Sequence, residues 1–240
     1  MLPWVVLFLV GILLFAQSYE KWGDPIIDLG RDLYLPGRLL NGRILYRDIL
    51  YNYGPVTPYL LAMLVRVFGD ALPVFETFGI LTGVAALYAL YGIGALIGGR
   101  GIAFFSALLF LTLSFFARST WGCNFVSPYS YAATISTALA LWSFYFSLRY
   151  LYNGSHPADL WWSTGFLFAT LFTKAEFGVA IVLVQMLAWS IHRIPLRVLA
   201  IIEIPFIMSS SLVKEGENED IDSRKKWYKP GGHGDHFPFA

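Results

Sequence analysis

Most of this chain consists of apolar segments, several of them long enough to span a bilayer, and these segments limit the folds that it can adopt. Residues 2–17, 72–97, 102–117 and 129–150 are predominantly apolar, and a membrane-spanning helix needs about 20 such residues. Only 14% of the 240 residues are charged, against roughly 25% in an ordinary soluble domain. The chain has too little charge to cover the surface of a soluble fold. The sequence predicts an all-α, polytopic transmembrane bundle of about six to seven helices.

Shorter apolar segments complete the predicted bundle. Residues 160–173 and 177–191 are joined by the short segment 173–176, which predicts a tight helical hairpin. Residues 56–68 are apolar but short, and we interpret them as an interfacial helix, with a short span as the alternative. Residues 197–209 contain Glu203 and Pro205, which argue against a further span.

The first apolar segment admits two interpretations. Residues 2–17 could be a signal peptide with a cleavage point near Ala16. A signal peptide begins with a basic stretch, which is absent here, and many hydrophobic segments follow. We therefore favour a retained first helix.

The distribution of arginine predicts an orientation in a plasma or inner membrane. With a cytoplasmic N-terminus, the short loops at Arg100, Arg149 and 193–197 all lie on the cytoplasmic side, as the positive-inside rule requires. The loops that would then face outward are 18–71, 118–128 and 173–176.

The long first outer loop, 18–71, carries balanced charge and some helical periodicity. Within residues 25–35, Leu29 and Leu33 fall on one helical face, with Asp28 and Asp32 on another. Pro36 and Gly37 should interrupt any continuous helix. A simple interpretation of the acidic residues is that Asp28 or Asp32 forms a surface ion pair with Arg31.

The composition changes near residue 209. Residues 1–208 form the predicted membrane domain, whereas residues 209–240 are polar and rich in glycine, which predicts a disordered tail. The net charge of +1 gives no indication of a nucleic-acid partner. The sequence predicts no required cofactor. Use of a divalent metal ion stays an alternative.

Ionisable groups at the predicted outer face are the candidates for chemistry. These groups are the charged residues of the first loop, Arg118, and the pair Lys174 and Glu176. Charges near bilayer depth are expensive and usually functional. The alternative is that Lys174 and Glu176 form a turn whose charges reach the lipid headgroups.

The order of motifs in the first loop resembles a known family. The loop has Asp28, then Asn41-Gly42, Leu45-Tyr46-Arg47-Asp48 and Tyr53-Gly54-Pro55 before an apolar helix, and Leu171–Glu176 and Gly99-Arg100 follow later. This order resembles the polytopic C-type glycosyltransferases that use polyprenyl-phosphate-linked sugars, including protein O-mannosyltransferases and lipid A aminoarabinose transferases. The resemblance covers about residues 1–208.

The resemblance implies a reaction and roles for particular residues. A sugar would pass from polyprenyl phosphate to an acceptor hydroxyl of a glycan, lipid or protein, with inversion and with Asp28 as general base. Arg118 and Lys174 would bind the donor phosphate. The residues that would shape the acceptor side or the loop are Tyr46, Arg47, Asp48 and Glu176.

Two departures from the family pattern define the competing hypotheses. Leu29 stands where many members have a second acidic residue, and further C-terminal helices of the family are absent, which predicts a truncated chain. A non-catalytic lipid-binding or scaffold protein is therefore the main alternative. A transporter has less support, because the sequence has no paired broken helices in repeated halves.

Overall fold

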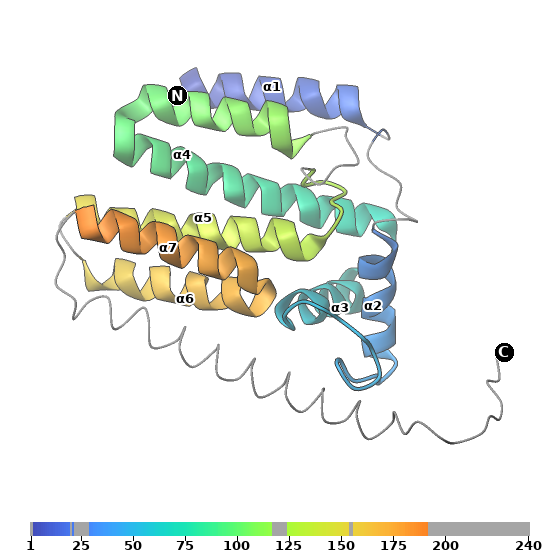
Figure 1. The fold of residues 1–240 in the computed structure, drawn as a ribbon. Helices are drawn as coiled ribbons and strands as arrows, with labels where there is room; N and C mark the ends of the chain where they lie inside the picture. The colour runs from blue at the N-terminus through green and yellow to red at the C-terminus, as the bar shows by residue number, and fades with distance from the viewer. Residues whose placement is uncertain (1, 20, 22–28, 117–123, 154–155, 192–240) are drawn as a thin grey trace, which may run out of the picture. The chain divides into compact units, whose positions relative to one another are not determined.

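The described part of the chain is helical. The computed structural model describes residues 2–19, 21, 29–116, 124–153 and 156–191, all within a compact unit, Met1–Pro195. The elements are α1 (Leu2–Ser18), α2 (Gly30–Leu40), α3 (Val56–Phe68), α4 (Leu72–Phe110), the π-helix η1 (Leu111–Phe115), α5 (Tyr131–Tyr152), α6 (Pro157–Thr173) and α7 (Ala175–Ile191). Within these ranges the prediction of an all-α chain is confirmed (Figure 1). The segments 197–209 and 209–240 lie outside the described residues.

One helical element is long and apolar enough to cross a membrane. Among the described residues this element is Leu72–Phe115, and the criterion rests on its length and composition only. Three shorter apolar helices accompany it: α1, α3 and α7. The finding is a weak indication of a membrane location, since the core helix of a soluble protein can pass the same test.

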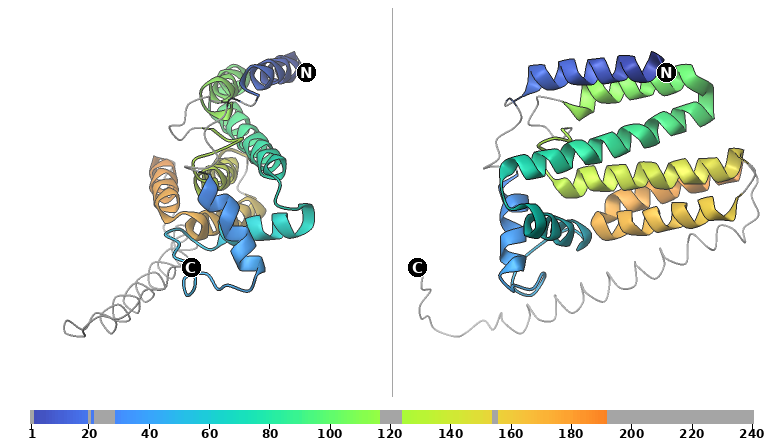
Figure 2. Two further views of the ribbon diagram at one scale, coloured as in Figure 1. Left: turned by 90° about the vertical axis from the view of Figure 1, so that its right-hand side faces the viewer. Right: turned by 180° about the vertical axis from the view of Figure 1, so that it is seen from behind.

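Gly99 breaks α4 into two helices. Its φ of 77° and ψ of −170° are not helical, and a φ in this range favours glycine. The chain reverses there, and both views show the two halves of α4 lying side by side (Figures 1 and 2). A Cβ atom on Gly94 would lie 2.7 Å from the Cα atom of Ala103, so the two backbones approach closely. The predicted break between residues 97 and 102 is confirmed.

The helix α1 packs against α4 and η1. Its Leu7 is buried in a cluster with Leu87 and Leu111. The ring of Trp4 lies 4.9 Å from the ring of Tyr88 and 4.3 Å from that of Tyr91, between centroids. The N-terminal apolar segment is thus part of the packed helices.

The helices α5, α6 and α7 pack together through small polar side chains. Ser143 Oγ donates to the Ser163 carbonyl at 2.8 Å, and Ser163 Oγ donates to the Ser143 carbonyl at 2.9 Å. Gln185 Nε2 donates to Ser143 Oγ at 2.8 Å. Small and hydroxyl-bearing residues at helix contacts are typical of membrane bundles. The predicted hairpin of 160–173 and 177–191 is confirmed as α6 and α7, which are separated by Lys174.

The segment around Pro36 differs from the prediction. The helix α2 continues through Pro36 and Gly37 to Leu40. An internal proline costs about 3 kcal/mol through a lost hydrogen bond and a steric clash. Leu29, just before the helix, and Leu35 within it are both buried, and each buried leucine contributes about 1.5–3 kcal/mol. The free energy gained by burying these leucines therefore exceeds the cost of the internal proline.

Candidate functional site

The candidate site is built where α2, the segment 41–55, the start of α5 and the α6–α7 turn meet. Asp32 of α2 is 1% exposed. Its carboxylate accepts the backbone N–H of Tyr131, the first residue of α5, at 2.8 Å. The first N–H groups of a helix have no partner within the helix, and the N-cap Ser130 forms no side-chain cap. Asp32 therefore caps α5 from another helix.

The position of Asp32 corrects the sequence-based expectation. The sequence predicts that Asp32 lies on a helical face away from Leu29 and forms a surface ion pair with Arg31. Asp32 does pair with Arg31, with 3.2 Å between Asp32 Oδ1 and Arg31 Nε, but its side chain is buried. Burial raises the pKa of Asp32, and the neighbouring Arg31 guanidinium opposes that shift.

Arg31 lies over two tyrosine rings of the segment 41–55. Its Cζ atom is 5.5 Å from the ring centroid of Tyr51 and 5.1 Å from that of Tyr53. The Arg31 side chain is 40% exposed, and its Nε donates to Asp32. A cation over an aromatic face is held by the ring quadrupole.

Gly54 attaches the segment 41–55 to the end of α6. Its N–H donates to the Thr173 carbonyl at 3.1 Å, which satisfies one of the carbonyl groups left open at a helix C-terminus. A Cβ atom on Gly54 would lie 1.8 Å from the Phe172 carbonyl oxygen. Only glycine allows this approach.

The attachment brings Lys174 to the same tyrosine as Arg31. Lys174 Nζ lies 4.8 Å from the ring centroid of Tyr53. Among the described residues, no carboxylate forms an ion pair with Lys174. Two cations from distant parts of the chain therefore lie close to one aromatic ring. Such a pair is suited to bind an anion such as a phosphate.

The segment 41–55 is also held by its own polar contacts. Asp48 accepts two hydrogen bonds of 3.0 Å from the Arg47 guanidinium and one of 2.8 Å from the Ile44 N–H. The hydrogen bond from Arg47 is the main cause that lowers the pKa of Asp48 to about 2. Tyr46 Oη donates to the Tyr53 carbonyl at 2.7 Å. Tyr46, Arg47 and Asp48 therefore make the contacts expected of residues that shape the loop.

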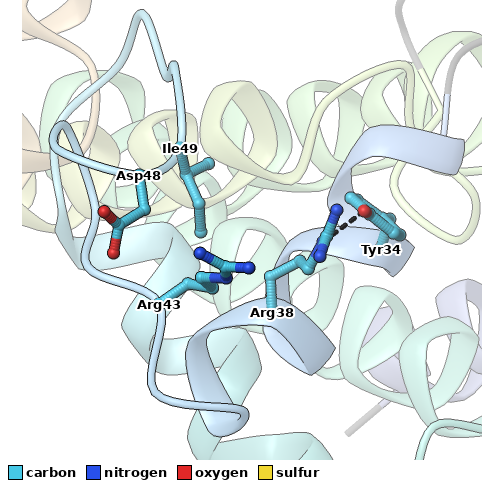
Figure 3. Close-up of a pocket in the computed structure, with 5 residues that line it drawn as sticks. All are labelled: Tyr34, Arg38, Arg43, Asp48 and Ile49. Atoms are coloured by element: carbon cyan, nitrogen blue, oxygen red, sulfur yellow. Dashed lines mark hydrogen bonds between the residues drawn. The ribbon is translucent and has the colours of Figure 1, made fainter. Parts of the chain in front are cut away.

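A pocket of about 350 Å³ lies between α2 and this segment (Figure 3). Its lining residues are Tyr34, Arg38, Arg43, Asp48 and Ile49. Arg38 Nε donates to the Tyr34 hydroxyl, as the dashed line in Figure 3 marks. The Arg38 Cζ atom lies 4.9 Å from the Tyr34 ring centroid. The pocket is rich in guanidinium groups.

The structure brings together only some of the predicted site residues. Asp28 and Arg118 lie outside the described residues. Lys174 lies beside Tyr53, whereas Glu176 is exposed in the first turn of α7. Within the described ranges, no group of three or more His, Cys, Asp or Glu side chains could hold a metal ion.

Sequence reasoning missed the roles of Arg31, Asp32 and Tyr53. For Asp32 a signal was present: it follows Leu29 by three residues and precedes Pro36 by four, which is the spacing of one buried helical stripe. A carboxylate in such a stripe needs a partner. The pairing of Tyr53 with Lys174 had no local signal.

Comparisons of the chain with models of known protein families, with curated proteins and with solved structures find no match. The resemblance to C-type glycosyltransferases therefore stays a prediction that rests on the motifs themselves.

Proposed function

We propose that the chain is a multi-pass membrane glycosyltransferase that moves a sugar from a polyprenyl-phosphate donor to an acceptor hydroxyl. The observation that carries the proposal is that Arg31 and Lys174 both lie close to the ring of Tyr53. The motif order of the first loop supplies the reaction class, and the cation pair supplies a place for the donor phosphate.

Exposed apolar side chains support the membrane location. Only 33% of the apolar window in Leu72–Phe115 is buried, whereas the core helix of a soluble protein would be mostly buried. Large apolar residues are exposed along several helices, among them Phe8, Leu9, Leu13, Leu81, Phe105, Leu109, Leu113, Leu183 and Leu187. Exposed large apolar residues on several helices are expected where those helices face a membrane or another protein.

The proposed sidedness is supported by contacts between the loops expected on one side. The first loop contacts the start of α5 through Asp32 and the α6–α7 turn through Gly54. The arginine distribution predicts that the first loop and the α6–α7 turn lie outside, and α5 begins shortly after the third predicted outer loop, 118–128. A lipid-linked donor fits this arrangement, because its chain needs apolar helices while its sugar phosphate must reach water.

The proposed reaction is a single displacement. The acceptor oxygen bonds to the anomeric carbon, the bond from that carbon to the phosphate oxygen breaks, and Asp28 takes the hydroxyl proton. The phosphate keeps the electron pair of the broken bond and gains negative charge. Cations fixed beside it stabilise the transition state. Arg31 joins Lys174 in this role, with Arg118 as the third candidate.

Replacing Lys174 by Gln tests the proposal. We expect kcat/KM for the polyprenyl-phosphate sugar to fall at least about tenfold, because a charged hydrogen bond to the phosphate contributes roughly 1.5–3 kcal/mol. Lys174→Arg should restore much of the activity, since it restores the charge. The matched control is Arg100→Gln, an exposed cation at the α4 break. Unchanged kinetics in Lys174→Gln would remove Lys174 from the donor site.

A further inference from the structure

The pocket between α2 and the segment 41–55 carries an excess of positive charge. Two guanidinium groups, those of Arg38 and Arg43, line it together with a single carboxylate, that of Asp48. In the part of the chain that the structure describes, neither arginine forms an ion pair with a carboxylate. Figure 3 shows Arg43 on the side of Asp48 and Ile49, and the guanidinium of Arg38 next to Tyr34.

The one carboxylate in the pocket is already engaged. Both oxygens of Asp48 accept hydrogen bonds from Arg47, and one of them also accepts the Ile44 N–H. The low pKa of Asp48 reflects these bonds, with a smaller contribution from Arg43. Asp48 organises the loop and leaves the charge of Arg43 largely unbalanced.

Arg38 is oriented by an aromatic ring. It lies over Tyr34 and donates Nε to the Tyr34 hydroxyl, so its remaining N–H groups are available. A guanidinium group held in this way can offer two parallel N–H groups to a phosphate. The volume of about 350 Å³ is sufficient for a phosphate and a small substituent.

Exposed apolar residues stand close in the sequence to the residues that line the pocket. Leu40 is 43%, Ile44 45% and Leu50 81% exposed. Arginines beside exposed leucine and isoleucine side chains are typical of segments that lie at a membrane surface, with the apolar groups in the acyl region and the cations at the headgroups. A soluble anion would make no use of these apolar side chains.

We propose that this pocket binds the phosphate headgroup of an anionic membrane lipid, separately from the donor site at Tyr53. The arginines Arg38 and Arg43 contact the phosphate, and Leu40, Ile44 and Leu50 contact the acyl chains near the headgroup. Bound lipid would hold the segment 41–55 at the membrane surface. The proposal rests on the membrane location in the proposed function and does not require sugar transfer.

Binding of a short-chain lipid tests the proposal. The full chain, purified in a nonionic detergent, is titrated with dioctanoyl phosphatidic acid by calorimetry. We expect saturable binding that weakens roughly a hundredfold in the double variant Arg38→Gln, Arg43→Gln, since each of the two charged contacts is worth roughly a factor of ten. The matched control, Arg66→Gln, alters an exposed arginine in the last turn of α3 and should leave the affinity unchanged.

Three outcomes would overturn the proposal. One is an unchanged affinity in the double variant with an unchanged thermal unfolding midpoint. A second is equal affinity for dioctanoyl phosphatidylcholine, whose headgroup is zwitterionic. The third is inorganic phosphate competing at the same concentration as the lipid, which would show that the acyl chains contribute nothing to binding. Because the titration contains no sugar donor, its failure would not count against sugar transfer.

Discussion

Asp28→Asn is expected to lower the rate of sugar transfer by roughly 10²–10⁴-fold, because it removes the proposed general base. Asparagine has nearly the shape of aspartate but cannot accept the hydroxyl proton. Expression and membrane insertion should be intact, since one uncharged amide replaces one carboxylate in a polar loop. The measurement is single-turnover transfer from a polyprenyl-phosphate sugar by purified protein.

Asp32→Asn is the matched comparison for Asp28→Asn, and the two should behave oppositely. Asp32 is 1% exposed and caps α5, so an acceptor hydroxyl cannot reach it. The amide oxygen introduced by this substitution would still accept the Tyr131 N–H, but the charge opposite Arg31 would be lost. We expect a lower unfolding temperature with transfer per folded molecule largely retained. Normal transfer in Asp28→Asn together with abolished transfer in a stable Asp32→Asn would show that the base was assigned wrongly.

Gly54→Ala should detach the segment 41–55 from the end of α6. The added Cβ atom would lie 1.8 Å from the Phe172 carbonyl oxygen, and this backbone group cannot turn aside as a flexible side chain could. Overpacking of this kind costs about 1–3 kcal/mol. Tyr53 would move away from Lys174, so we expect both a lower unfolding temperature and weaker donor binding, measured as a higher KM.

Gly37→Ala is the matched control for Gly54→Ala. Gly37 lies inside α2, and a Cβ atom there would meet nothing within 4 Å. Alanine favours a helix over glycine by about 1 kcal/mol, so this variant should be as stable as the parent chain or slightly more stable. If Gly54→Ala matched Gly37→Ala in both stability and KM, the attachment to α6 would not support the donor site.

The helix boundaries were predictable where local residues decide them. The helix α3 begins directly after Gly54-Pro55 and ends at Phe68, because the φ of 88° at Gly69 stops it. Its bounds match the predicted 56–68. The break at Gly99 was predictable for the same reason, because glycine permits a positive φ. These features depend only on residues close in the chain.

The candidate site was less predictable because distant residues build it. The cap from Asp32 to Tyr131 joins residues 99 positions apart, so the sequence around Asp32 does not reveal what covers it. The same holds for Tyr53 and Lys174, which meet only because Gly54 packs against the end of α6. The motif resemblance identified Lys174 as a candidate cation but gave no reason to choose Arg31.

The most direct test of the account is whether the purified full chain consumes a polyprenyl-phosphate hexose. Donor is incubated with glycan, lipid and peptide acceptors, and with water alone, and released polyprenyl phosphate is measured together with the anomeric configuration of the product. The account predicts release of polyprenyl phosphate with inversion at the sugar carbon. Stoichiometric binding of the donor with no release in any of these mixtures would contradict it and would favour a lipid-binding scaffold.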